Sequence, residues 1–148
     1  MKTYAENKKA FFDYEIIDKY EAGMVLEGHE VKAVKKGKVS IIGSYVKIMG
    51  QEAFLWGAII QPYQPLNTPK NYDPQRSRKL LLNKKEISSF IGKTNEKGLT
   101  IVPLRVYDKK GRIKLEIGLA RSKKKTDKRE KIKKREEKRK LERALKQH

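Results

Sequence analysis

The sequence predicts a mainly β (β+α) domain: an oligonucleotide-binding-type antiparallel β-barrel of about six strands, with two or three peripheral helices and a basic C-terminal tail. Three observations lead to this fold class. Short apolar or alternating segments recur between turns that contain glycine or proline. No alternation of strand, helix and parallel strand is present. The last 28 residues are dominated by charge. Closure into a small barrel removes the free edges of short antiparallel strands.

The expected strands differ in how they are buried. Residues 11–18 alternate apolar and polar side chains until Ile17 breaks the pattern. Residues 52–60, EAFLWGAII, are apolar on both faces, as a central barrel strand is. In the last strand the apolar residues fall at every second position from Ile113 to Leu119. The predicted strands are 11–18, 21–26, 44–50, 52–60, 99–108 and 112–121.

A short helix and a long loop are expected in the first half of the chain. Residues 28–37 have valines three positions apart and end at Gly37, which suits the left-handed residue that ends a helix. Four of the five prolines then fall within 62–74. A structureless loop of this length inside a compact domain is usually functional or mobile.

A second helix is expected to begin at Asn83. Asn83 and Glu86 have the spacing of a capping box, in which each side chain bonds the backbone N–H of the other residue. The buried stripe of this helix is Ile87, Phe90 and Ile91. The capping role competes with any contact that Asn83 makes to a ligand.

The net charge of +19 is unevenly distributed. Residues 121–148 hold fifteen Lys or Arg and five Asp or Glu, and residues 1–120 hold 22 and 13, so the tail carries +10 and the body +9. Ile132 and Leu141 are nine positions apart and project to opposite sides of a helix, so the tail has no apolar face to bury. We therefore expect residues 1–120 to be an RNA-binding barrel with a short basic N-terminal arm. The tail is expected to be disordered when free and helical along a polyanion.

Several function classes find no support in the residues. The chain has no cysteine, and its two histidines, His29 and His148, lie far apart, so no metal site and no cofactor are predicted. Gly92-Lys93-Thr94 lacks the first glycine of a phosphate-binding loop. No acid and base pair suggests catalysis, and we expect the protein not to be an enzyme. No export signal or membrane span is present, so we expect a cytoplasmic location.

The positive signals are typical of RNA binding. Arg76-Ser77-Arg78-Lys79 follows the proline-rich loop, which contains Tyr63 and Tyr72. Basic side chains that can contact phosphate therefore lie beside aromatic rings that can stack on exposed bases. The alternative is a solubilising loop whose tyrosines pack on the barrel rim. The basic arm with Lys8 and Lys9 fits phosphate contact, or is a merely solvated N-terminus.

Long, ordered stretches of the chain resemble the SsrA-binding protein (small protein B) family, from about residue 7 to the end. The stretches are NKKA at 7–10, EAGMVLEGHEVKAVKKGKVSIIGSYV at 21–46, RSRKLLLNKKEI at 76–87, EKGLTIVPLRVY at 96–107 and KKKTDKRE at 123–130. The resemblance implies an adaptor that binds the tRNA-like domain of tmRNA and enters stalled ribosomes with alanyl-tmRNA, elongation factor Tu and GTP for trans-translation. It also implies that the tail occupies the decoding region of the small-subunit rRNA and the empty mRNA channel, as a helix.

The resemblance and the charge pattern together give the candidate RNA contacts. Glu30, Leu81 and Asn83 match family positions linked to tmRNA binding. The candidates in the body are Lys8, Lys9, Glu30, Lys32, Tyr72, Arg76, Arg78, Lys79, Leu81 and Asn83. Those in the tail, toward the ribosome, are Lys123, Lys124, Thr126, Asp127, Lys128, Arg129, Lys133, Lys134 and Arg135.

The chain departs from the family pattern at four positions. Ser122 stands where glycine is common, and Thr126 where histidine or an aromatic ring is frequent, which puts a stacking contact at Thr126 in doubt. Tyr72 stands in place of a frequent histidine and Gly43 in place of a frequent aspartate.

Two other readings remain open from the residues alone. A resident ribosomal or general RNA-binding protein with a basic tail fits the composition equally well. An RNA-cleaving or RNA-modifying enzyme would need an acid and base cluster or a metal, which the sequence does not offer. We expect a monomer, because no long apolar seam is left over.

Overall fold

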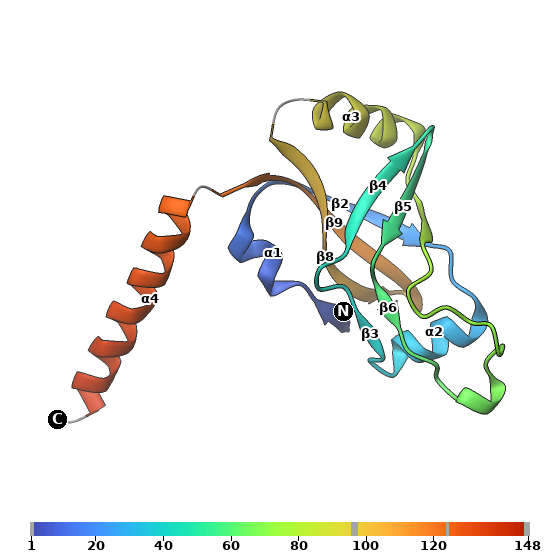
Figure 1. The fold of residues 1–148 in the computed structure, drawn as a ribbon, viewed down its shortest axis with the longest axis horizontal. Helices are drawn as coiled ribbons and strands as arrows, with labels where there is room; N and C mark the ends of the chain where they lie inside the picture. Colours follow the sequence, from blue (N-terminus) through green and yellow to red (C-terminus); the bar gives the residue numbers. More distant parts are fainter. Residues whose placement is uncertain (1, 96–97, 124, 147–148) are drawn as a thin grey trace.

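The computed structural model describes residues 2–95, 98–123 and 125–146, with the backbone alone at 125–131 and 146. Within these residues the chain forms nine strands, four α-helices and one 3-10 helix (Figure 1). The elements are, in order, β1 (Thr3–Glu6), α1 (Lys8–Asp13), β2 (Tyr14–Met24), α2 (Gly28–Lys35), β3 (Val39–Ser40), β4 (Tyr45–Met49), β5 (Glu52–Trp56), β6 (Ile59–Ile60), η1 (Pro65–Asn67), β7 (Arg78–Leu81), α3 (Lys84–Thr94), β8 (Leu99–Lys109), β9 (Arg112–Ser122) and α4 (Lys125–Lys146).

The strands form one large antiparallel sheet and a small one. The large sheet has the order β1-β8-β9-β2-β7-β5-β4, and β3 pairs with β6. The predicted mainly β class is confirmed, with more strands and helices than predicted. The sheet is not closed into a barrel, because no ladder joins β1 or β8 to β4 in the described chain. β4 nevertheless lies beside β8.

The N-terminal residues are ordered elements rather than the predicted loose arm. β1 pairs with β8, and Asn7 caps the short helix α1. The Asn7 side chain is buried; its Oδ1 accepts from the Ala10 N–H at 3.2 Å and its Nδ2 donates to the Pro103 carbonyl at 2.9 Å. The bond to Pro103 and the pairing with β8 join residues about a hundred positions apart, so the local sequence pattern gives no sign of them.

The predicted strands at 11–18 and 21–26 are one long strand, β2, which begins only after α1 ends at Asp13. Ile17 lies in a bulge of its ladder with β9, where the register shifts between Ile16 and Asp18. The side chain of Ile17 is 46% exposed. The break in alternation at Ile17 is therefore the sequence signal of a β-bulge.

Two turns explain where the later strands begin and end. Gly57 has φ 82° and separates the predicted strand 52–60 into β5 and β6. Lys110 and Gly111, with φ 51° and 81°, join β8 to β9. Two central residues with positive φ match the right-handed twist of a hairpin, and the predicted strands 99–108 and 112–121 pair in this way.

The core fills the inner face of the sheet, and α3 packs on β8. Phe90 of α3 is fully buried and meets the Tyr20 ring edge-on, with 4.5 Å between ring centroids. The predicted capping box of α3 is confirmed: Asn83 Oδ1 accepts from the Glu86 N–H at 2.8 Å, and Glu86 Oε1 accepts from the Asn83 N–H at 3.2 Å.

The outer side of β8, opposite β9, is paired with β1 on only one side of Pro103. The register of β8 with β9 shifts between Pro103 and Arg105, and β1 covers β8 only from Arg105 onward. The Pro103 carbonyl faces Asn7, and the N and O atoms of one strand residue point to the same side of the strand. Because Pro103 has no N–H, the outer side of β8 lacks a hydrogen-bond donor at this position, whereas the ladder with β9 loses none.

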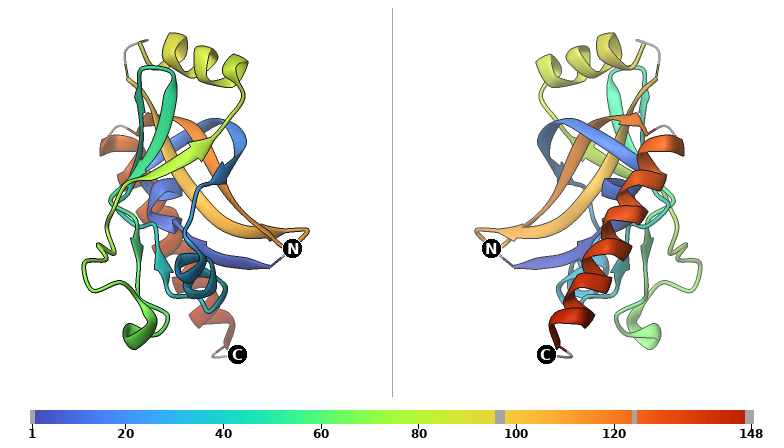
Figure 2. Two further views of the ribbon diagram at one scale, coloured as in Figure 1. Left: turned by 90° about the vertical axis from the view of Figure 1, so that its right-hand side faces the viewer. Right: turned by 90° about the vertical axis from the view of Figure 1, so that its left-hand side faces the viewer.

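The helices lie on different sides of the sheet. Figure 1 shows α2 and η1 at the lower right and α4 at the left, with the sheet between them. The two side views of Figure 2 agree, with α4 in front in one and behind in the other. Among the described residues no helix is long and apolar enough to cross a membrane.

Candidate RNA interface

A buried charged cluster joins α2 to β7. Glu30 and Arg78 are both 0% exposed. Glu30 is the N3 residue of α2, and its Oε1 accepts from the Glu27 N–H at 3.0 Å. Arg78 donates to Glu30 Oε2 through Nη2 at 2.7 Å and Nε at 3.1 Å, and to the Ala58 carbonyl through Nη1 at 2.9 Å. Pairing and hydrogen bonding of this kind offset the cost of burying both charges.

Arg76 approaches the same carboxylate from the surface. Its Nη2 forms an ion pair with Glu30 Oε1, and its Nε donates to Glu30 Oε2 at 3.2 Å. Burial would raise the pKa of Glu30, but hydrogen bonds from Arg76, the Glu27 N–H and Arg78 hold that pKa at about 2. Glu30 is therefore ionised at neutral pH. It holds Arg76 at the surface with 31% of the arginine side chain exposed.

Tyr72 closes the cluster from the proline-rich loop. Its hydroxyl lies 2.8 Å from the Ile60 carbonyl and 3.1 Å from Glu30 Oε2, and accepts from Arg78 Nη2 at 2.9 Å. Burial and the nearby Glu30 charge raise the pKa of Tyr72 to about 12. Its ring meets His29 edge-on with centroids 4.7 Å apart. Tyr72 is thus engaged within the protein at its hydroxyl and at its ring, which leaves less of the ring for the predicted stacking on bases.

Two of the predicted contacts are internal. The sequence predicts that Glu30 bonds base or sugar edges and that Arg78 meets phosphate, yet neither side chain has surface that RNA can reach. The alternation of β7 explains the burial of Arg78, because Arg78 points inward together with Leu80 while Lys79 points outward. Of the basic run at 76–79, Arg76 and Lys79 reach the surface.

Other candidates in the body are exposed on this side. Lys32 borders a cavity of about 420 Å³ between the start of α2 and the proline-rich loop. Lys79 pairs with Glu52 at 3.1 Å, and Leu81 is 56% exposed. The cap engages Oδ1 of the exposed Asn83, while Nδ2 has no hydrogen-bond partner in the described chain. Asn83 can therefore cap α3 and still donate to RNA.

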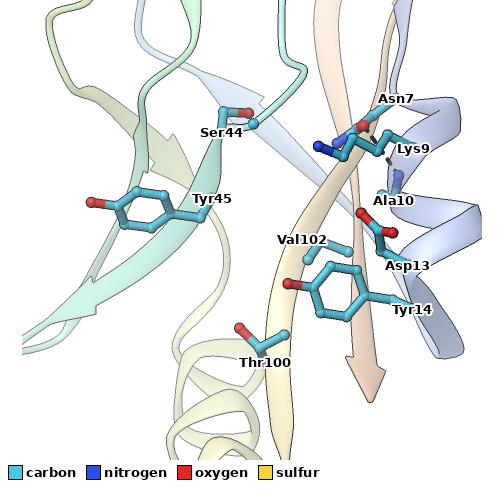
Figure 3. A pocket seen from close by; sticks show the side chains of 10 residues that line it. Asn7, Lys9, Ala10, Asp13, Tyr14, Ser44, Tyr45, Thr100 and Val102 are labelled. Carbon is cyan, nitrogen blue, oxygen red and sulfur yellow. Dashed lines mark hydrogen bonds between the residues drawn. The ribbon is translucent and has the colours of Figure 1, made fainter. Parts of the chain in front are cut away.

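Lys8 and Lys9 lie elsewhere, on α1 toward the tail. Lys9 lines a cavity of about 250 Å³ where α1 faces the start of β4 across β8 (Figure 3). Lys123, at the end of β9, donates from its backbone N–H to the Asp13 carbonyl at 3.0 Å and from Nζ to the Phe11 carbonyl at 3.1 Å. The N-terminal lysines therefore adjoin the root of the tail and not the Glu30 cluster.

The tail candidates are described in part. Lys133, Lys134 and Arg135 are exposed on α4, and the Arg135 guanidinium lies 5.5 Å from the Phe12 ring centroid. Lys124 and the side chains of Thr126, Asp127, Lys128 and Arg129 lie outside the described residues.

Among the residues that are described, no three His, Asp or Glu side chains gather as metal ligands would.

An antiparallel sheet with exposed cations on one side and a cationic helix on the other defines a small basic protein of the RNA-binding class. Residues 4–147 match the model of the SmpB protein family. The chain belongs to this family.

The relatives agree along nearly the whole chain. An SsrA-binding protein of Thermosynechococcus vestitus is 48% identical over 147 residues, which cover 99% of this chain and 97% of the relative. One of Cupriavidus necator is 52% identical over 144 residues, with 97% and 96% covered. A chain from the structure described as "tmRNA-SmpB: a journey to the center of the bacterial ribosome" has a TM-score of 0.66 and 45% identity, with 81% of this chain and 84% of that chain covered.

Proposed function

We propose that this protein is a non-enzymatic adaptor that binds the tRNA-like domain of tmRNA and delivers it to stalled ribosomes for trans-translation. Membership of the SmpB family, relatives named SsrA-binding proteins and a neighbour described with tmRNA and the ribosome support this function. The protein acts in the cytoplasm as a monomer. It meets elongation factor Tu and GTP through alanyl-tmRNA.

The observation that carries the proposal is the presence of two cationic regions on opposite sides of the sheet. One region, formed by α2, β7 and the start of α3, presents Lys32, Arg76 and Lys79. The other comprises α1 and α4, on the opposite side (Figure 1). A protein that connects two RNA molecules needs two such regions. The first serves tmRNA, and the second serves the small-subunit rRNA of the decoding region and the empty mRNA channel.

The tail forms the helix α4 in this structure. In solution the tail of the free protein should be disordered, and it becomes helical on the ribosome. Every described side chain from Ile132 to Leu145 is exposed, so α4 gains little from burial. Its i,i+4 pairs, such as Glu136 with Lys140, contribute only about 0.2–0.5 kcal/mol each against the repulsion of the tail's charge. NMR of the free protein checks this: sharp, poorly dispersed resonances for 125–148 are expected. A rigid tail docked on the sheet contradicts it.

Deleting residues 125–148 tests whether the body alone binds tmRNA while the tail is needed on the ribosome. A boundary at 120/121 would cut into β9, which runs to Ser122. The deletion therefore starts at residue 125, so that Lys123 and its contacts with α1 are kept. The truncated protein should keep tmRNA affinity within about threefold but lose tagging on stalled ribosomes in a cell-free system. A matched control replaces Glu136 and Glu137 by glutamine, which leaves the cations and the tagging activity intact.

Three further measurements separate the alternatives. Neutralising about six to ten phosphates predicts that tmRNA affinity falls by about 10³–10⁵ between 50 and 200 mM salt. An adaptor is enriched on stalled ribosomes, whereas a resident ribosomal protein is present on every translating ribosome. Catalytic turnover of labelled tmRNA, with or without Mg²⁺, would refute a non-enzymatic role.

A further inference from the structure

The outward side of β4, β5 and β7 carries three aromatic rings and Lys47 beside the predicted contacts Lys79 and Leu81. In the ladder, Lys47 lies opposite Phe54, and Phe54 lies opposite Lys79. The alternate residues Leu55 and Leu80 are buried, so this row points away from the core. The β4–β5–β7 outer face comprises Tyr45, Lys47, Phe54, Trp56, Lys79 and Leu81.

The rings on this face are only partly covered by the rest of the described chain. Tyr45 is 50% exposed, and Phe54 and Trp56 are half-buried rather than buried. The Lys47 ammonium lies 6.0 Å from the Trp56 ring centroid. Trp56 Nε1 is buried and has no acceptor among the described residues, so no hydrogen bond within them fixes the indole in place. A concentration of exposed apolar side chains on one face of a sheet indicates an interaction surface.

The charge on this face selects the kind of partner. Lys47 and Lys79 stand on both sides of Phe54, and Glu52 of β5 pairs with Lys79 at 3.1 Å. Rings bordered by lysines suit unpaired nucleotides, because bases stack on the rings while phosphates meet the ammonium groups. A protein partner would have to bury both lysines in the middle of an apolar contact.

The place of this face in the fold indicates which RNA it meets. It continues along β7 to Leu81, next to Asn83, so it adjoins the region proposed for tmRNA. α4 lies on the far side of the sheet and does not cover it (Figure 1). We propose that the β4–β5–β7 outer face stacks unpaired bases of tmRNA, with Phe54 and Trp56 as the stacking rings and Lys47 as the main phosphate contact. This inference rests on the proposed function.

Trp56 is the single tryptophan of the chain, so its fluorescence reports on this face alone. The full-length protein is titrated with an in vitro transcript of the tRNA-like domain of tmRNA. Trp56 emission should be quenched with a midpoint equal to the Kd from filter binding. Phe54→Leu keeps an apolar side chain but removes the ring, and should weaken binding about tenfold. Lys47→Gln should lower the salt slope by about one unit.

Two control variants test whether the loss of affinity is specific to the rings on this face. Phe11→Leu removes a ring that is 39% exposed from α1 on the other side of the protein, and should leave affinity and quenching unchanged. Trp56→Phe loses the signal but keeps a ring that can stack, so its affinity should stay within about twofold. Circular dichroism melting establishes that each variant is folded at the assay temperature.

The outcomes separate this inference from the proposed function. If the transcript binds by filter assay while Trp56 emission is unchanged and Phe54→Leu binds within twofold of the unsubstituted protein, the stacking face is wrong and the proposed function stands. If the transcript does not bind at all, the proposed function fails first. Quenching at the filter-binding midpoint, together with the selective loss in Phe54→Leu, supports the inference.

Discussion

Replacing Glu30 by glutamine tests whether the buried charged cluster holds α2 to β7. The substitution keeps the shape of the side chain and removes its charge, so the fully buried Arg78 loses its counter-ion. Breaking a buried ion pair in this way costs about 3–5 kcal/mol. The lowered pKa of Glu30 gives a similar free energy. A fall in pKa from 4.5 to about 2 corresponds to about 3 kcal/mol, at ~1.4 kcal/mol per pKa unit.

Urea unfolding followed by circular dichroism at pH 7 measures this loss, as a lower midpoint at unchanged m-value. For a chain of this size the melting temperature should fall by about 10 °C. Glu52→Gln is the matched control, since it removes an exposed partner of Lys79 and should cost less than about 1 kcal/mol.

The pH dependence gives the cluster a second signature. The folded-state pKa of Glu30 lies below its unfolded value of 4.5, so its contribution is fully present above pH 4.5 and is lost as the pH falls toward 2. The stability gap between the unsubstituted protein and Glu30→Gln should therefore narrow over this range. A Glu30→Gln variant within about 1 kcal/mol at pH 7, or a gap of equal size at pH 7 and pH 3, refutes the reasoning.

Three other substitutions probe local features. Asn83→Ala should lower the free energy of unfolding by about 1 kcal/mol in urea melts because the α3 cap is lost. Asn83→Asp keeps the cap but exchanges the Nδ2 donor for a negative charge, so a weaker tmRNA affinity in that variant indicates that the RNA lies against this position. Gly118→Ala should cost about 1–3 kcal/mol in thermal melts, because the new Cβ meets Leu104 Cδ1 at 3.0 Å. Lys123→Ala removes the 3.1 Å bond to the Phe11 carbonyl, and should raise hydrogen exchange in α1 severalfold with a nearly unchanged urea midpoint.

The features that the sequence predicts correctly are local. The capping box at Asn83 and Glu86 needs only residues three positions apart. The hairpin of β8 and β9 follows from two neighbouring strand-forming segments that flank Lys110-Gly111. The break at Ile17 marks a bulge because the period of a strand is two residues. In each case a few neighbouring residues determine the conformation.

The features that the sequence does not predict depend on distant partners. Glu30 and Arg78 are 48 positions apart, and charged residues are rarely buried unless paired, so their pattern suggested surface groups. Residues 52–60 are read as buried on both faces, yet Phe54 and Trp56 lie on the outward side of the sheet. Apolar composition alone does not show whether a strand has a second layer above it. β1 forms only because β8 offers it an edge.

The partly open side of β8 also affects how copies of this chain behave toward one another. An uncovered strand edge is a template on which a second molecule can add its own strand, and such addition leads to aggregates. Here Pro103 supplies no donor on that side, the nearby bulge disturbs the spacing of the remaining groups, and α1 places Lys8 and Lys9 close by. The same stretch that leaves the sheet unclosed thus discourages the addition of a strand from a second molecule.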